Sequence, residues 1–146
     1  METEPRDTNQ INRHTTKLDS RYEGQPSPPQ QQPDSTANVP NTISLELNDS
    51  RRKKLLVDFA KSDAVVGRGT EEGVIDMTPH GAFEHGVSRR HAVLSRRDGG
   101  IFIEDKDSTN GTRINGFTLR PNRAYLLRQG DEIEFGRLRT TVRFNK

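Results

Sequence analysis

Three short tracts hold the side chains of this sequence whose types and spacing could do chemistry. They are Gly67-Arg68-Gly69, Ser88-Arg89-Arg90-His91 and Ser108-Thr109-Asn110-Gly111-Thr112. Together they supply guanidinium groups, hydroxyls, a carboxamide and backbone amides beside glycines, which are donors suited to a multiply charged oxyanion. They offer no set of groups with which to break a bond. We therefore interpret the three tracts as a phosphate-recognising surface.

Each tract taken alone also has a plainer interpretation. Arg68 can present paired N–H donors to a phosphate, but it can equally be a surface arginine in a glycine turn. We expect His91 to be a buried hydrogen-bonding residue rather than a ligand, and Arg90 to point away from Arg89 in an extended segment. The tract that begins at Ser108 could be only a polar hairpin loop. For the three tracts to have no shared role, the plainer interpretation would have to be correct for each of them independently. Their joint occurrence therefore favours a binding site.

The elements that position these tracts are predicted to be β-strands. No segment keeps a helical pattern of apolar residues over ten positions, and period-two alternation recurs from residue 43 onward. The turn sequences Asp98-Gly99-Gly100 and Asn115-Gly116 supply the positive φ angles that tight hairpins need. The sequence thus predicts an all-β fold, an antiparallel β-sandwich of about 100 residues. The alternating apolar positions are Ile43, Leu45 and Leu47; Leu55, Val57 and Phe59; Ile101 and Ile103; Ile133 and Phe135; Val142 and Phe144.

Composition divides the 146 residues into two parts. Residues 1–41 hold six of the eight prolines and carry four basic and six acidic side chains, whereas residues 42–146 carry nineteen basic and fifteen acidic ones. The first part has too few apolar residues to offset the entropy of ordering the chain. We therefore predict a disordered tail over residues 1–41 and a folded domain over residues 42–146.

Several classes of protein are disfavoured by composition. The chain has no cysteine, so neither disulfides nor thiolate metal sites are expected. No apolar run approaches the length of a membrane span, and the N-terminus lacks the pattern of a secretion signal, which predicts a cytoplasmic protein. The pI of about 9.1 raises nucleic acid as a partner. The basic residues are scattered among acidic ones rather than aligned in one stripe, so nucleic-acid binding is not favoured.

Catalysis, cofactors and metals find little support in the sequence. Gly67 and Gly69 are not followed by a helix pattern, which argues against a dinucleotide fingerprint. The opening Asp105-x-Asp107-x-Thr109 imitates a calcium loop but has Asn110 where glycine is required. The four histidines have no metal-ligand spacing, and a Ser-x-x-His pair on an extended segment points to opposite faces. We predict no enzyme, no cofactor and no metal.

The order and spacing of the motifs over about residues 43–144 resemble those of forkhead-associated (FHA) domains, particularly bacterial ones. FHA domains are sandwiches of the SMAD/FHA type that bind phosphothreonine. The motifs that carry the resemblance are the Gly67-Arg68, Ser88 to His91 and Ser108 to Thr112 tracts, Asn115-Gly116, and Gly130-Asp131-Glu132-Ile133-Glu134-Phe135-Gly136.

The resemblance implies a role for each of eight residues. Phosphate would be bound by Arg68, Ser88 and Thr109, with Arg89 at a more variable assisting position. Asn110 would hold the main chain of the bound peptide. The loops would be shaped by Gly67, His91 and Gly111. The eleven residues 76–86 that precede this site leave the preference for flanking peptide residues open.

The expected function is a phosphothreonine-dependent protein-binding adaptor that acts downstream of a Ser/Thr protein kinase. Tail threonines Thr8, Thr15 and Thr16 are candidate phosphorylation sites, through which the tail could occupy the domain's own site or that of a neighbouring molecule. An inert linker or a partner-binding tail is the alternative. The competing function is a phosphate-independent assembly or scaffold module built on the same sandwich.

Overall fold

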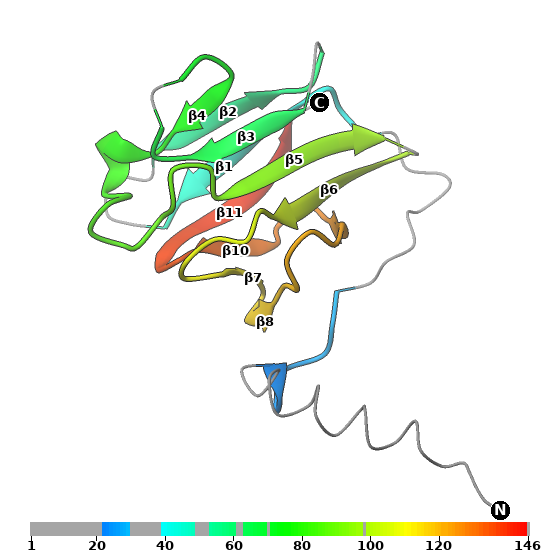
Figure 1. Cartoon of the computed structure of the whole chain (residues 1–146). Helices are drawn as coiled ribbons and strands as arrows, with labels where there is room; N and C mark the ends of the chain where they lie inside the picture. The colour runs from blue at the N-terminus through cyan, green and yellow to red at the C-terminus, as the bar shows by residue number, and fades with distance from the viewer. Residues whose placement is uncertain are drawn as a thin grey trace, which may run out of the picture.

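Two β-sheets pack face to face in the computed structural model, which describes residues 22–29, 39–48, 53–60, 63–69, 71–97 and 99–145 (Figure 1). The first sheet contains β1 (Thr42–Leu47), β2 (Lys54–Asp58), β7 (Thr112–Ile114), β8 (Phe117–Thr118), β10 (Glu132–Phe135) and β11 (Leu138–Asn145). The second contains β3 (Ala64–Gly67), β4 (Val74–Asp76), β5 (Ala92–Arg97), β6 (Gly100–Asp105) and β9 (Tyr125–Leu127). A 3-10 turn, η2 (Thr78–His80), follows β4, and the described residues contain no α-helix. The predicted all-β sandwich is confirmed.

The strand order is β2-β1-β11-β10-β7-β8 in one sheet and β4-β3-β5-β6-β9 in the other. Eight of the nine strand pairs are antiparallel, as predicted, but β3 and β4 run parallel. Val74 lies opposite Val65, so the chain has returned toward the start of β3 by the time β4 begins. This short return forms one wall of the site described below.

The core lies between the sheets and is made largely of the alternating apolar residues. Because successive side chains of a strand point to opposite faces, period-two alternation places one set against the facing sheet. The side chains of the edge strand β2 and its flank are less covered: Leu55 and Phe59 are only half-buried, whereas Val57 is fully buried. Full burial of one such side chain contributes about 1.5–3 kcal/mol. The predicted positions that are fully buried are Ile43, Leu45, Leu47, Val57, Ile101, Ile103, Ile133, Phe135 and Val142.

Both predicted hairpin turns are present. Asn115 (φ 49°) and Gly116 (φ 87°) connect β7 to β8, with the two positive φ angles of a type I′ turn. Gly99 (φ 76°) lies between β5 and β6. These turns fix the register of the strands that carry the candidate site.

The register of the five-stranded sheet brings the three chemistry-bearing tracts to one edge. Val66 of β3 lies opposite Ala92 of β5, which in turn lies opposite Asp105 of β6. One tract follows the end of β3, the second precedes the start of β5, and the third follows the end of β6. Because these neighbours are antiparallel, their ends meet at one edge of the sheet, at the left of Figure 1. The fold thus places the tracts side by side although they are distant in sequence.

Two described parts of the predicted tail contact the domain. Arg96 donates to the carbonyl oxygens of Val39 (3.0 Å) and Pro40 (3.0 Å), and Val39 packs against the core. Residues 22–29 lie against the β8 edge, where the side-chain amide of Gln25 both accepts from the backbone N–H of Thr118 and donates to its carbonyl oxygen. The boundary at residue 42 stays a prediction.

The tail threonines singled out from the sequence, Thr8, Thr15 and Thr16, lie outside the described residues.

Candidate anion-binding site

Ser88 is the point at which the three loops meet. Its carbonyl oxygen accepts from the backbone N–H of Arg68 (3.2 Å), and its Oγ accepts from the backbone N–H of Thr109 (3.0 Å). Its own N–H donates to Nδ1 of His91 (2.9 Å). These three hydrogen bonds connect Ser88 with Arg68, with Thr109 and with His91. Since Ser88 Oγ is an acceptor toward Thr109, its hydroxyl proton can be donated to a ligand.

Arg68 is held in place by contacts at two points along its side chain. Its Nε donates to the carbonyl oxygen of Val87 (2.8 Å), and its guanidinium carbon lies 5.4 Å from the centre of the Phe83 ring. Phe83 is 70% exposed, so the cation–π contact lies on the surface. With Nε engaged, the two terminal nitrogens form the fork that can grip two oxygens of one phosphate.

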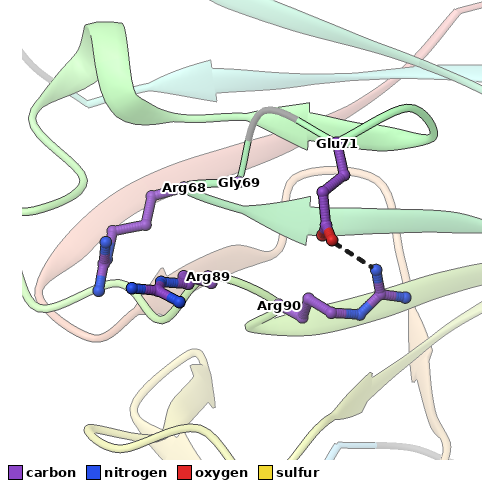
Figure 2. A pocket seen from close by; sticks show the side chains of 5 residues that line it. All are labelled: Arg68, Gly69, Glu71, Arg89 and Arg90. Atoms are coloured by element: carbon purple, nitrogen blue, oxygen red, sulfur yellow. Dashed lines mark hydrogen bonds and ion pairs between the residues drawn. The ribbon is translucent and has the colours of Figure 1, made fainter.

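The second cation of the site is Arg89. Figure 2 shows its guanidinium group extending toward that of Arg68 in the same hollow. Neither arginine makes an ion pair with any residue in the described ranges. Two guanidinium groups that share a hollow without carboxylate partners form a positive site suited to a dianion.

His91 is completely buried and connects the loop of Ser88 with the loop of Gly111. Its Nδ1 accepts from Ser88 N–H, and its Nε2 lies 2.8 Å from the carbonyl oxygen of Gly111, to which it must therefore donate. Both bonds are satisfied only by the neutral ring with its proton on Nε2. Burial lowers the pKa of His91, and the bond to Gly111 and the nearby Asp105 carboxylate oppose this only in part. The expected structural role of His91 is consistent with this geometry.

Asp105, whose spacing in the sequence suggested only an incomplete calcium loop, holds the third loop in place. It is 2% exposed, and one carboxylate oxygen accepts from Ser108 Oγ (2.5 Å) and from Thr112 Oγ1 (2.6 Å). The other oxygen accepts from the Ser108 N–H (3.1 Å), and Ser108 Oγ accepts from the Gly111 N–H (3.0 Å). An Asp three residues before a Ser has the spacing of a side chain that accepts from the backbone N–H three residues on, a signal that could have identified it.

Asn110 connects the third loop with the segment that precedes Ser88. Its Nδ2 donates to the carbonyl oxygen of Gly86 (2.9 Å), which leaves its Oδ1 as an acceptor for a main-chain N–H of a peptide. A Cβ on Gly86 would lie 2.5 Å from this nitrogen, so glycine is needed for the contact. At Gly111 space is not limiting, and its φ of +84° is the reason for glycine.

The structure corrects the expectation for Arg90. Residues 89 and 90 form a turn rather than an extended segment, so both arginines line one hollow of about 460 Å³ together with Arg68, Gly69 and Glu71 (Figure 2). The same turn brings His91 back toward Ser88, contrary to the expectation of opposite faces. The contact is made by the Ser88 backbone N–H and not by its hydroxyl, so no nucleophile–base pair results.

The fold and the convergent loops define a β-sandwich module that recognises an anion at one edge of a sheet. Residues 64–136, half of the chain, match the family model described as FHA domain, and this chain belongs to the FHA domain family. FHA domains recognise phosphorylated motifs in other proteins. The matched region is therefore a recognition module rather than an enzyme, as predicted.

Known proteins of this family are similar over part or all of the domain. An oxoglutarate dehydrogenase inhibitor of Corynebacterium diphtheriae is 42% identical over 53 residues, which cover 36% of this chain and 35% of that protein. A structure solved in a study of phosphothreonine-dependent FHA domain interactions has 25% identity and a TM-score of 0.57, covering 72% of this chain and 98% of that one. The FhaA FHA domain, solved in complex with the intracellular domain of another protein, has 26% identity and a TM-score of 0.54, covering 69% and 99%. The chain thus aligns with about a third of the curated relative's length.

Two kinds of feature are absent from the described residues. No group of three or more histidine or carboxylate side chains gathers there in a way that could hold a metal ion. None of the helical segments there has the length and hydropathy needed to cross a bilayer.

Proposed function

We propose that this FHA domain is a phosphothreonine-dependent adaptor that binds partner proteins in the cytoplasm after a Ser/Thr protein kinase has phosphorylated them. Five residues contact the phosphopeptide: Arg68, Ser88, Arg89, Thr109 and Asn110. Gly67, His91 and Gly111 hold the loops in shape. The observation that carries the proposal is the convergence of three loops on Ser88, with two guanidinium groups beside it.

The physical argument for phosphate dependence rests on the donors. A phosphothreonine carries about two negative charges and three acceptor oxygens at neutral pH, whereas an unmodified threonine carries no charge. Covering Arg68 and Ser88 with an unphosphorylated peptide would leave their donors without partners, at a cost of about 1–3 kcal/mol each. Reversible signalling suits an affinity in the micromolar range, about −8 kcal/mol.

An oriented library of phosphothreonine peptides, followed by calorimetric titration of the best binder and its unphosphorylated twin, tests the proposal. We expect micromolar binding of the phosphopeptide and at least about 100-fold weaker binding of the twin. Equal affinity for the two would instead favour the phosphate-independent assembly module. Tight, steeply salt-dependent binding to DNA or RNA with no preference for phosphothreonine would indicate a nucleic-acid partner.

The proposal includes regulation by the chain's own N-terminal residues. The Tyr22 ring lies 4.5 Å from the Arg120 guanidinium carbon, Gln25 pairs with Thr118, and Pro26 lies beside Gly116. Residues 22–26 therefore run antiparallel to residues 116–120, with Tyr22 at the Arg120 end. Backbone bonds from Leu119 to Thr112 and from Asn122 to Asp105 place that end beside the loop that bears Thr109.

Reach also supports this regulation. Thr16 precedes Tyr22 by six residues, which span up to about 20 Å when extended. A phosphate on Thr8, Thr15 or Thr16 could then occupy the domain's own site and exclude other ligands.

Phosphorylation of the tail is expected to weaken external phosphopeptide binding by about tenfold or more, because the tethered ligand competes at high effective concentration. The measurement is a titration of the full chain, phosphorylated at Thr8, Thr15 or Thr16, against a chain that lacks residues 1–21. The unphosphorylated full chain is the control. If the phosphorylated chain binds as well as the truncated one, the tail is an inert linker or serves another partner.

A further inference from the structure

The hollow beside Arg68 is larger than one phosphate requires. Its volume is about 460 Å³. On the same measure one water molecule needs about 10–15 Å³, so a phosphate counted generously as four waters needs about 60 Å³. Figure 2 shows how the lining divides: the ends of Arg68 and Arg89 lie together at one side, and Glu71 and Arg90 meet at the other. Space and a third cation therefore remain beyond the proposed phosphate position.

Arg90 is held by a weak and exposed partner. Its Nη1 lies 3.5 Å from Oε1 of Glu71, and the two side chains are 58% and 67% exposed. A single long contact between exposed charges is strongly screened by water and salt. An anion that offers two oxygens to the guanidinium fork has the better geometry and can displace Glu71.

The charges of the hollow leave a place for such an anion once Glu71 has moved away. Three guanidinium groups and one carboxylate leave a net formal charge of +2 at the lining. A phosphothreonine at Arg68 and Arg89 balances that charge only while Glu71 keeps Arg90 neutralised. When Glu71 swings into solvent, Arg90 becomes an unpaired cation beside the bound phosphopeptide.

We propose that Arg90 forms a second anion subsite that takes the carboxylate or phosphate of a residue flanking the phosphothreonine, with Glu71 as its displaceable occupant. The inference rests on the proposed function and adds a preference for flanking residues to it. Peptide residues advance about 3.3 Å each, so residues up to three positions from the phosphothreonine lie within about 10 Å of it. The subsite would lie at the Arg90 end of the segment that runs from Gly86 to Arg90, whereas Asn110 contacts its Gly86 end.

The test uses a reference phosphothreonine peptide with neutral flanks and a set of derivatives. Each derivative carries one aspartate at a position from three before to three after the phosphothreonine, and a further one carries a second phosphothreonine. Calorimetric titration compares the wild type with Arg90→Gln and Glu71→Gln. Arg143→Gln is the matched control, because Arg143 forms a similar surface pair with Glu46 (3.2 Å) on the other sheet.

We expect an aspartate at one or more positions to tighten binding to the wild type by about three- to tenfold, and the second phosphate to do so more strongly. The gain should disappear in Arg90→Gln, increase in Glu71→Gln and persist in Arg143→Gln. The neutral peptide should bind the wild type and Arg90→Gln within about twofold.

The outcomes separate this inference from the proposed function. If the neutral phosphopeptide binds but no acidic position gives a gain, or the gain survives in Arg90→Gln, the second subsite is wrong and the proposed function stands. If no phosphopeptide of the set binds the wild type, both fall together.

Discussion

Arg68→Ala is expected to abolish measurable phosphopeptide binding while leaving the domain folded. Charge-assisted hydrogen bonds contribute about 1.5–3 kcal/mol each, and the guanidinium fork can make two to one phosphate. Losing both would weaken a micromolar interaction by about 100-fold or more. Stability should change little, because among the described residues the half-buried side chain gives up one hydrogen bond, to Val87, and a surface contact with Phe83.

Calorimetric titration and thermal denaturation of the same preparation measure the two effects. Arg143→Ala removes one surface guanidinium from the other sheet and controls for net charge. Near-unchanged affinity in Arg68→Ala would show that phosphate is bound elsewhere. A large fall in melting temperature would show that the arginine is chiefly structural.

Gly67→Ala is expected to have the largest effect on stability among single-methyl additions near the site. An added Cβ would lie 2.0 Å from the carbonyl oxygen of Arg89 and 2.8 Å from that of Ser88. Both obstacles are backbone atoms, so the loop that carries the two residues must move. We expect the free energy of unfolding to fall by about 3 kcal/mol, with phosphopeptide binding lost because Ser88 and Arg89 are displaced together.

Gly69→Ala is the matched control, two residues further along the same turn. Its Cβ would lie 3.4 Å from the Arg89 carbonyl oxygen, an ordinary contact, and its backbone needs no positive φ. Chemical denaturation should therefore find the stability of Gly69→Ala close to that of the wild type. Equal behaviour of the two variants would mean that the close approach at Gly67 does not position the loop.

Much of the fold follows from local pattern alone. Alternation at Ile43 to Leu47 and at Ile101 to Ile103 reports which face of a strand is buried, because strand side chains alternate by covalent geometry. Asn115-Gly116 specifies a hairpin, since few other pairs adopt two consecutive positive φ angles. The same local chemistry singled out Arg68 and the serine and threonine tracts as donors. These features need no knowledge of distant contacts.

Contacts between residues far apart in the chain were decided only by the tertiary structure. The turn at Arg89 placed Arg90 in the hollow, where an extended segment had been expected, and only the return of the chain after β3 brought Glu71 to meet it. Asp105 became a brace because β6 delivers it, buried, beneath Ser108 and Thr112. The hydrogen bond between Gln25 and Thr118 joins residues 93 positions apart, and no local sequence pattern predicts it.

The physical reason for this division is the range of the interactions. Backbone sterics and side-chain period act over a few residues, so the sequence by itself determined the alternating strands, the two hairpin turns and the inventory of phosphate donors. Which donors share one hollow depends on sheet register and loop packing, where many weak contacts are satisfied at once. Only the folded domain therefore determines which of these donors lie together in the hollow.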